Sequence, residues 1–470
     1  MDRRKFVRHA SLASAGFMLL GASAFGANDS FPVVRVPVRK RNFRSQAIED
    51  IIEEMQGSIA NKELGWLFGN CFPNTLDTTV EFEIVNGKPD TYVITGDIDA
   101  MWLRDSSAQV WPYIAFCNKD EKLKQLIAGV INRQTKCIIK DPYANAFYKN
   151  NTIVSPWHKD DTDMKSGIHE RKWEIDSLCY PIRLAYGYYS TTGDKSPFDE
   201  QWVEAMKLVV KTFKTQQRKD NCGPYRFMRS SPYATDSVPM DGYGYPAKPN
   251  GLICSMFRPS DDATIYPYLV PSNIFALDVL KKLKAMLTSM SIRFDFDALN
   301  ELIADIDNGL QDAIVRFKNV GDIYAYEING YGSHVLMDDA NVPSLLSLGY
   351  LIPEMKRTEI YKSTRKFVLS SDNPFFFKGR VGEGVGGPHA GLNMIWPLGI
   401  TMRGLTSENP EEIQKCIQLL LNTHADTGFM HEAFNKDDAK QFSRPWFAWA
   451  NTLFGEFILH VNRKHPELLG

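Results

Sequence analysis

Acidic side chains recur at the start of apolar stretches along this 470-residue chain. Two of these sites carry neighbouring carboxylates, Asp261-Asp262 and Asp338-Asp339. Breaking a glycosidic bond requires two carboxyl groups, one that donates a proton and one that attacks carbon or activates water. The pattern favours this chemistry but does not select two acids from the set Asp97, Asp99, Asp105, Glu174, Asp176, Asp261, Asp262, Asp338, Asp339, Glu383 and Glu432.

Glu432 differs from the other acids in its surroundings. It follows His431 and precedes Ala433 and Phe434 in the stretch Gly428–Phe434. A carboxyl group in such apolar company is expected to be partly buried, and burial changes the pKa of a carboxyl group. A structural role in an ion-pair network is the alternative interpretation, because such networks also perturb acids.

The remaining reactive side chains give no sign of a metal or a cofactor. His334, His389 and His431 stand singly, whereas a metal site needs clustered ligands. The glycine-rich stretch Gly382–Gly387 lacks the lysine and the Ser or Thr of a phosphate loop. We therefore expect no metal and no cofactor, and we expect the histidines to contact sugar hydroxyls or to form structural hydrogen bonds.

The acids belong to a unit that recurs six times, roughly every 55 to 90 residues. In each unit a polar stretch with an acid or an amide runs into an apolar helix. The six polar stretches are Trp102–Asp105, Trp173–Asp176, Ser260–Asp262, Met337–Asp339, His389–Asn393 and Arg444–Asn451. Other segments have the 3.6-residue period of an amphipathic helix: Ser45–Ile59, Glu121–Lys140, Phe198–Gln217, Ile274–Ser289, Phe296–Phe317 and Glu411–Ala425.

Each period therefore holds one helix that is apolar nearly all round and one that is amphipathic. The first kind must be buried, and the second can cover it from outside. We predict an all-α fold, an (α/α)6 toroid of helical hairpins with small β-hairpin insertions, one of them formed by Val80–Val85 and Thr91–Thr95 around Asn86-Gly87. If the buried helices start at one rim, so do their acids. The simpler alternative is that these acids only cap helix N-termini.

Composition narrows the class of protein. The net charge is −2, and nothing suggests a surface that follows phosphates, so nucleic acid is not an expected partner. The seven cysteines contain no C-x-x-C pair, which indicates neither a disulfide framework nor a zinc site. A single disulfide is the alternative that the sequence leaves undecided. Aromatic residues are expected mainly in the core, with some tryptophans placed to stack on sugar rings.

The N-terminus has the layout of an export signal. Basic residues from Arg3 to Arg8 precede the apolar run Ala13–Leu20 and the small residues Ala22-Ser23-Ala24. The Arg3-Arg4 pair resembles a twin-arginine signal, and a general secretory signal is the alternative. We predict that residues 1–28 are a signal peptide and that residues 29–470 form a single catalytic domain. The bacterial protein would be periplasmic or secreted, with no stable membrane span once the signal is removed.

Five stretches together resemble glycoside hydrolase family 125: Gly96–Ser106, Phe257–Ala263, Gly332–Pro343, Gly386–His389 and Gly428–Glu432. The resemblance covers essentially the whole chain after the signal. It implies an (α/α)6 fold and an exo-acting α-mannosidase that prefers α-1,6 linkages, inverts the anomeric carbon and needs no metal or cofactor. The substrate would be a mannose-containing oligosaccharide, either of the N-glycan type or a mannan fragment.

The resemblance also implies roles for individual residues. The family's Asp proton donor falls on Asp261 or Asp262, with Asp261 preferred, and its Glu base falls on Glu432. The terminal mannose would be held by Arg104, Asp105, His334, Asp338, Asp339 and His389. For an inverting enzyme the two catalytic carboxyl groups are expected ~6.5–9.5 Å apart, which leaves room for a water molecule.

Three other functions compete with this interpretation. One is another (α/α)6 glycosidase, for instance one that acts on glucans, and a second is a glycan-binding protein without activity. The paired acids argue against the second, because binding alone does not require them. A third is a magnesium-dependent terpene or prenyl enzyme, but Asp338-Asp339 lacks the further Asp of a diphosphate–metal site.

Overall fold

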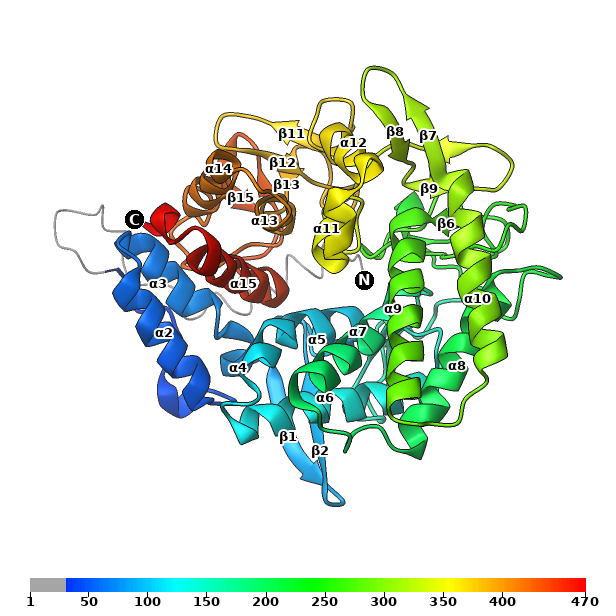
Figure 1. The fold of residues 1–470 in the computed structure, drawn as a ribbon, viewed down its shortest axis with the longest axis horizontal. Coiled ribbons are helices and arrows are strands. Elements are labelled where there is room, and N and C mark those ends of the chain that lie inside the picture. The colour runs from blue at the N-terminus through cyan, green and yellow to red at the C-terminus, as the bar shows by residue number, and fades with distance from the viewer. Residues whose placement is uncertain (1–30) are drawn as a thin grey trace.

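The computed structural model describes residues 31–470, so the predicted signal peptide lies outside the described residues. Helices alternate around a ring (Figure 1). The inner helices are α5 (Leu103–Val110), α7 (Ile175–Thr192), α9 (Val270–Ser289), α11 (Leu348–Leu351), α13 (Pro397–Leu405) and α15 (Ala448–Lys464). The outer helices are α3 (Lys62–Cys71), α6 (Glu121–Lys140), α8 (Glu200–Gln216), α10 (Phe296–Gly309), α12 (Glu359–Val368) and α14 (Pro410–Leu421). Two more helices, α2 (Gln46–Ser58) and α4 (Asn74–Thr78), pack against α3 and α15 respectively. The predicted (α/α)6 toroid is confirmed.

Burial distinguishes the two rings. Every residue of α5 is buried, as are Ile175–Ala185 of α7 and Val270–Leu277 of α9. The outer α6 instead buries one face, which includes Leu123, Ile127 and Ile131. This is the division expected when amphipathic helices cover a ring of helices that are buried all round.

Capping distinguishes the rings as well. Each outer helix begins at a side chain that accepts a hydrogen bond from a backbone N–H of the first turn: Asn61, Asp120, Asp199, Asp295, Thr358 and Asn409. No inner helix has such a cap. The interpretation of the rim acids as helix caps is therefore wrong, and their side chains are available for other contacts.

Five of the six predicted amphipathic segments are helices, namely α2, α6, α8, α9 and α14, although α9 belongs to the inner ring. The sixth prediction, Phe296–Phe317, is wrong at its C-terminal end. There α10 stops at Gly309, and Ile314–Phe317 forms strand β7. A short 3-10 turn, Leu310–Ala313, separates the two, and the β-branched pair Ile314-Val315 suits the strand.

Small sheets tie the starts of the inner helices together. The three-stranded sheets are β3 (Met101–Trp102), β4 (Ala146–Phe147) and β5 (Ile168–Glu170); β6 (Tyr268–Leu269), β9 (Glu327–Ile328) and β10 (His334–Val335); and β13 (Met394–Ile395), β14 (Phe434–Asn435) and β15 (Asp438–Phe442). In chain order, β3 leads into α5 and β5 precedes α7. In the second sheet, β6 leads into α9 and β10 precedes α11. In the third, β13 leads into α13 and β15 precedes α15. Each sheet thus joins the starts of two successive inner helices at the rim.

The other sheets are two-stranded hairpins. They are β1 (Val80–Val85) with β2 (Lys88–Val93), β7 with β8 (Gly321–Tyr324), and β11 (Phe376–Lys378) with β12 (Glu383–Val385). The first was predicted from its sequence. Asn86 and Gly87 at its turn have φ of 51° and 76°, the left-handed conformation that a two-residue hairpin loop requires.

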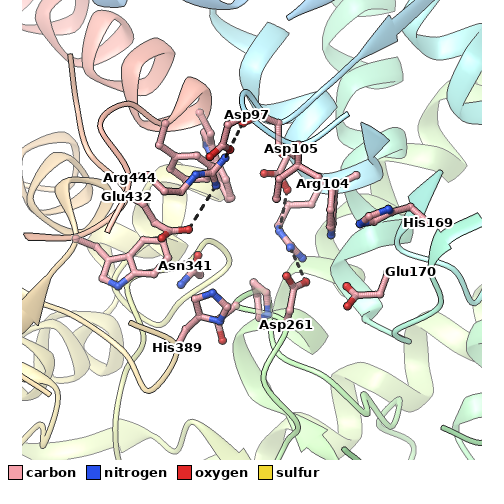
Figure 2. A pocket seen from close by; sticks show the side chains of 18 of the residues that line it. Asp97, Arg104, Asp105, His169, Glu170, Asp261, Asn341, His389, Glu432 and Arg444 are labelled. Carbon is pink, nitrogen blue, oxygen red and sulfur yellow. Dashed lines mark hydrogen bonds and ion pairs between the residues drawn. The ribbon is translucent and has the colours of Figure 1, made fainter. Parts of the chain in front are cut away.

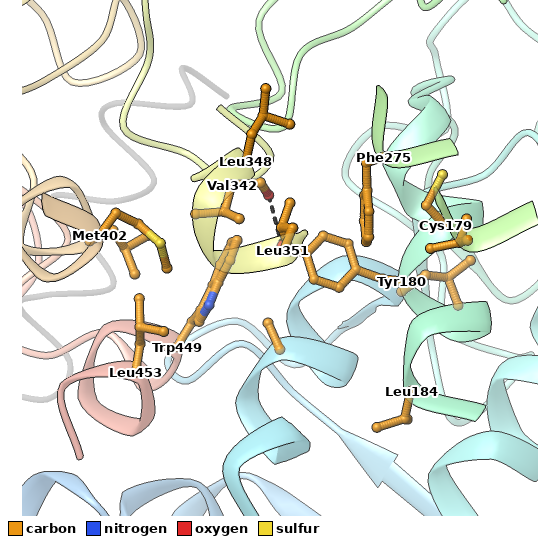
Figure 3. Packing of buried hydrophobic residues seen from close by; sticks show 14 of the residues in the cluster. Cys179, Tyr180, Leu184, Phe275, Val342, Leu348, Leu351, Met402, Trp449 and Leu453 are labelled. Carbon is orange, nitrogen blue, oxygen red and sulfur yellow. Dashed lines mark hydrogen bonds between the residues drawn. The ribbon is translucent and has the colours of Figure 1, made fainter. Parts of the chain in front are cut away.

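The centre of the ring is filled by side chains (Figure 3). Tyr180 of α7 packs edge-on against Phe275 of α9 and Trp449 of α15, with ring centroids 5.2 and 6.1 Å apart. The Tyr180 hydroxyl donates to the carbonyl of Val342 at 3.0 Å, ahead of α11. The toroid therefore has a packed core rather than a channel, and a depression at the rim is closed underneath.

Candidate active site

One pocket lies at the rim where the inner helices begin (Figure 2). Its walls include Arg104 and Asp105 of α5, Asp261 before α9, Asn341 before α11 and Glu432 before β14. The other lining residues are Thr95, Asp97, Ile98, Trp102, Pro156, Trp157, His169, Glu170, Pro259, Ser260, His389, Trp396, Arg444, Phe447 and Trp449. Four of the predicted acids therefore gather at this pocket, namely Asp97, Asp105, Asp261 and Glu432.

Arg104 is the buried cation at the centre of one wall. Its Nη1 donates to Glu174 at 2.6 Å and to Asp176 at 3.0 Å, and its Nη2 lies 3.4 Å from Asp261. Asp105 lies 3.5 Å from Nε. Four carboxyl groups thus surround one guanidinium. Burial raises the pKa of Asp105 to about 6, although Arg104 pulls it down.

The neighbouring acids Asp261 and Asp262 point in different directions. Asp261 has φ of 64°, a left-handed conformation that Asp tolerates better than most residues. Its carboxyl group lines the pocket, held by Arg104 and by the Asn145 amide at 3.3 Å. Asp262 is only 2% exposed and lies 3.7 Å from His389 Nδ1, behind the pocket wall. Of the pair, Asp261 is the one that can reach a ligand.

Glu432 lies across the pocket from Asp261 (Figure 2). Its Oε2 accepts from Ser443 at 2.8 Å, and its Oε1 lies 3.5 Å from Arg444 Nη1. The carboxyl side chain is 14% exposed, so the predicted partial burial is confirmed. His431 anchors this segment by stacking on Phe442 with ring centroids 4.0 Å apart, and burial lowers its pKa to about 4.

Arg444 joins Glu432 to a further acid. Its Nη2 forms an ion pair with Asp97, which also lines the pocket. Arg444 is buried and packs over the ring of Phe447, the residue just before α15. The guanidinium therefore holds the side of the pocket that carries Glu432, as Arg104 holds the opposite side.

The second acid pair lies beneath the pocket. Asp338 is fully buried and accepts backbone N–H bonds from Leu345 and Leu346 at 2.8 and 2.9 Å, which holds the turn before α11. Asp339 accepts from both the backbone and the side-chain nitrogen of Asn341, each at 2.9 Å. Neither acid lines the pocket, whereas Asn341 does. The contacts of Asp339 position Asn341.

The other predicted site residues also divide into one that lines the pocket and two that do not. His389 lines the pocket. His334 is exposed on β10 and is not among the lining residues. Glu383 is also away from the pocket, paired with Arg403 at 3.0 Å and with Lys415, and these cations help to lower its pKa to about 2 despite its partial burial.

Several lining residues were not predicted as site residues. Arg444 lies inside a stretch that the repeat singled out, and Asn341 lies inside Gly332–Pro343 of the family resemblance, so both positions had an available signal. His169 and Glu170 lie three residues and more before the second repeat unit, on β5, and only the sheet that pairs β5 with β4 brings them to the pocket. The Asn145 amide, which contacts three carboxyl groups, had no sequence signal.

Across residues 31–470, no group of three or more His, Cys, Asp or Glu side chains is arranged to hold a metal ion. In the same range, no helix is long and apolar enough to cross a membrane. The seven cysteines are all unpaired, and six of them are buried.

Comparison with known proteins agrees with this geometry. Residues 61–459 match the family model for GH125, described as metal-independent α-mannosidase. A solved structure from Streptococcus pneumoniae is 37% identical, covers 90% of this chain and all of its own, and superposes with a TM-score of 0.86. It is described as a metal-independent α-mannosidase in a non-productive complex with α-1,6-mannobiose. The meiotically up-regulated gene 157 protein of Schizosaccharomyces pombe is 37% identical over 93% of this chain and 90% of its own length.

Proposed function

The chain belongs to glycoside hydrolase family 125, the metal-independent α-mannosidases, and from this premise we propose that it releases terminal α-1,6-linked mannose with inversion. The observation that carries the proposal is the pair Asp261 and Glu432, whose carboxyl groups lie on opposite sides of one pocket (Figure 2). Opposed carboxyl groups are what a glycosidase needs on the two faces of a sugar ring.

The proposed reaction is a single displacement. Asp261 gives its proton to the glycosidic oxygen as the bond to the anomeric carbon breaks. Glu432 takes a proton from a water molecule, which adds its oxygen to that carbon from the opposite face. Ser443 and Arg444 hold the Glu432 carboxylate as an acceptor that faces the pocket.

The pocket is suited to bind a ligand rich in hydroxyl groups. Five lining residues have a buried polar atom without a hydrogen-bond partner among residues 31–470: Thr95, Trp102, Arg104, Trp396 and Arg444. Unpaired buried polar atoms are rare in folded proteins and are satisfied when a polar ligand binds nearby. We assign contacts with the terminal mannose to Arg104, Asp105, Asn341 and His389, and sugar stacking to the tryptophans of the wall.

The shape of the pocket supports exo action, and similarity to a known structure supports the linkage preference. The packed core under Trp449 closes the pocket floor, so a chain end fits and a chain interior does not. The α-1,6 preference is supported by the mannobiose in the Streptococcus pneumoniae structure. The proposed substrates are mannose-containing oligosaccharides of the N-glycan type or mannan fragments.

We also propose that the protein is exported, to the periplasm or beyond. The support is the basic, apolar and small-residue layout of residues 1–28. Production of the full chain in a bacterium, followed by N-terminal sequencing of the periplasmic fraction, tests this. Cleavage shortly after Ala24 is expected, and an intact Met1 in the cytosolic fraction would contradict export.

The decisive test of function is incubation with α-1,6-mannobiose while the anomers of released mannose are followed by proton NMR. Inversion predicts that β-mannose forms first and then equilibrates with the α anomer. First formation of α-mannose would rule out the single displacement. Matched α-1,2- and α-1,3-mannobiose and an α-glucoside disaccharide serve as controls, and equal release from them would contradict the stated specificity.

A further inference from the structure

Glu174 is a fully buried acid that the proposed reaction leaves without a role. It stands at the start of α7, is 0% exposed and does not line the pocket. Its side chain nevertheless lies beside Asp261, because both carboxyl groups bind the Arg104 guanidinium and the Asn145 amide. A hydrogen bond between two such neighbouring carboxyl groups requires that one of them carries a proton.

The surroundings contain more acids than cations. The titratable groups that face Glu174 and Asp261 are Arg104 and Asp105 from α5, Asp176 from α7, Glu170 and Lys172 from β5 and the loop after it, and Tyr225. Glu170 is also paired with Arg229 at 3.0 Å, and Arg229 is shared with Asp160. Six carboxyl groups, counting Glu174 and Asp261, thus meet three cationic side chains. Like charges at this spacing cannot all be ionised at once, so the cluster retains a proton.

The hydrogen bonds of Glu174 indicate which of its oxygens carries that proton. Oε2 accepts from Arg104 Nη1 at 2.6 Å and from Ser177 Oγ at 2.8 Å. Among residues 31–470, the hydrogen-bond donor to Oε1 is the Asn145 amide at 3.5 Å, and that amide is shared with Asp261 at 3.3 Å. Oε1 is therefore the oxygen free to face the Asp261 carboxyl.

Burial raises the pKa of Glu174 well above its usual range; Arg104 opposes that rise, while Asp261 and Asp176 add to it. Burial raises the pKa of Asp176 as well, with Arg104 opposing the rise, but Glu174 is the acid that shares the Asn145 amide with Asp261. Of the two acids of α7, Glu174 is thus the one placed to hold a proton beside Asp261.

We propose that Glu174 is a positioning residue that shares one proton with Asp261. It thereby keeps Asp261, the proposed proton donor, protonated, while Arg104 and Asn145 orient the Asp261 carboxyl group. The inference rests on the proposed role of Asp261 as the acid. In turnover, the shared proton passes from Asp261 to the glycosidic oxygen as the C–O bond breaks. The pair is left as two carboxylates beside Arg104, and Asp261 regains a proton from solvent through the open pocket once product leaves.

Replacement of Glu174 by Gln tests the proposal through the pH dependence of kcat/KM. Loss of the shared proton leaves two adjacent anions in the wild type but only one in Glu174→Gln, so the lone Asp261 loses its proton at lower pH. The alkaline limb of the profile should move down by about one pH unit or more. An unmoved limb would overturn the proposal.

Two variants of α7 serve as matched controls. Ser177→Ala removes a hydrogen bond to the same Glu174 carboxyl but keeps both acids, so the alkaline limb should stay in place. Asp176→Asn removes a charge from the same Arg104 nitrogen without touching the shared proton, and its shift should be under half that of Glu174→Gln. Equal shifts in Asp176→Asn and Glu174→Gln would mean that net charge alone sets the profile, which would overturn the proposal.

A comparison of two substrates with different leaving groups separates a loss of proton donation from misfolding. An aryl mannoside with a strongly acidic phenol leaves without protonation, whereas the sugar alcohol of α-1,6-mannobiose does not. At the alkaline side, Glu174→Gln should lose about tenfold or more on mannobiose and less than about threefold on the aryl mannoside. Equal losses on both would indicate a structural role only.

Infrared spectroscopy gives a readout that does not depend on activity. The C=O stretch of a protonated buried carboxyl group should disappear at lower pH in Glu174→Gln than in the wild type. This result would stand even if the wild type released no mannose, an outcome that would refute the proposed function alone. Identical infrared titrations of the two proteins would refute the shared proton.

Discussion

At the scale of residues, neighbouring side chains of the same type have separate tasks. Asp261 has a left-handed backbone and lines the pocket, while Asp262 lies against His389. Asp338 holds a turn and Asp339 holds Asn341. A pair of neighbouring acids therefore indicates the rim, but the sequence does not show which of the two carboxyl groups lines the pocket.

Replacement of Glu432 by Gln should lower kcat by ~10² or more, because an amide cannot take the proton from water. The fold should persist, since Ser443 can still bond to the amide oxygen. Steady-state turnover of α-1,6-mannobiose measures the loss, with circular dichroism as the check on folding. Turnover within a few-fold of the wild type would remove Glu432 from the role of base.

Replacement of Asp105 by Asn should stabilise the protein at alkaline pH while impairing activity. Burial raises the pKa of Asp105 from 3.8 to about 6, so its contribution to stability is complete below ~4 and is lost as pH rises through about 6. At pH 8 the variant should gain on the order of 2 kcal/mol in unfolding free energy, and the gain should vanish near pH 4. Urea unfolding at both pH values tests this, and a gain that does not depend on pH would contradict it.

At the scale of elements, glycines let the inner helices approach their neighbours. A Cβ on Gly404 of α13 would lie 2.4 Å from the Phe457 ring of α15, and one on Gly455 of α15 would lie 2.4 Å from Phe72. A Cβ on Gly187 of α7 would lie 2.6 Å from the Trp111 ring. These contacts account for glycine inside helices, where it is otherwise unfavourable.

Replacement of Gly404 by Ala should push α13 from α15 and destabilise the fold by ~1–3 kcal/mol, as overpacking does. Gly57 of α2 is the matched control, because a Cβ there meets nothing within 4 Å. Gly57→Ala should instead stabilise the protein by ~0.5–1 kcal/mol. Thermal and urea unfolding compare the two, and changes of the same sign would refute the argument from packing.

At the scale of the whole molecule, the ring brings distant parts of the chain to one pocket. Arg104 and Glu432 are separated by most of the sequence, yet both lie on its wall (Figure 2). The three small sheets hold pairs of inner-helix starts in register, and the filled centre supplies the floor. Closure of the ring thus builds a site that no single hairpin could form.

Because the proposed chemistry uses only carboxyl groups, chelation should leave activity unchanged. Overnight dialysis against EDTA followed by assay on α-1,6-mannobiose should give the kcat/KM of untreated enzyme within error. A loss that a divalent cation restores would contradict a metal-independent reaction. A calcium-dependent α-mannosidase treated in parallel shows that the chelation worked.

Hydrophobic period and turn residues are local properties, so the sequence alone determined the helical hairpins, the hairpin at Asn86-Gly87 and the gathering of acids at helix starts. The motif resemblance narrowed the predicted catalytic pair to Glu432 and one of two aspartates. The tertiary structure decided what depends on long-range packing. It placed Asp261 rather than Asp262 in the pocket, added Asn145, Glu170 and Arg444, and moved Asp338 and Glu383 into supporting contacts. Side-chain direction and contacts between distant segments arise only when the ring closes, because no local pattern specifies which residues then become neighbours.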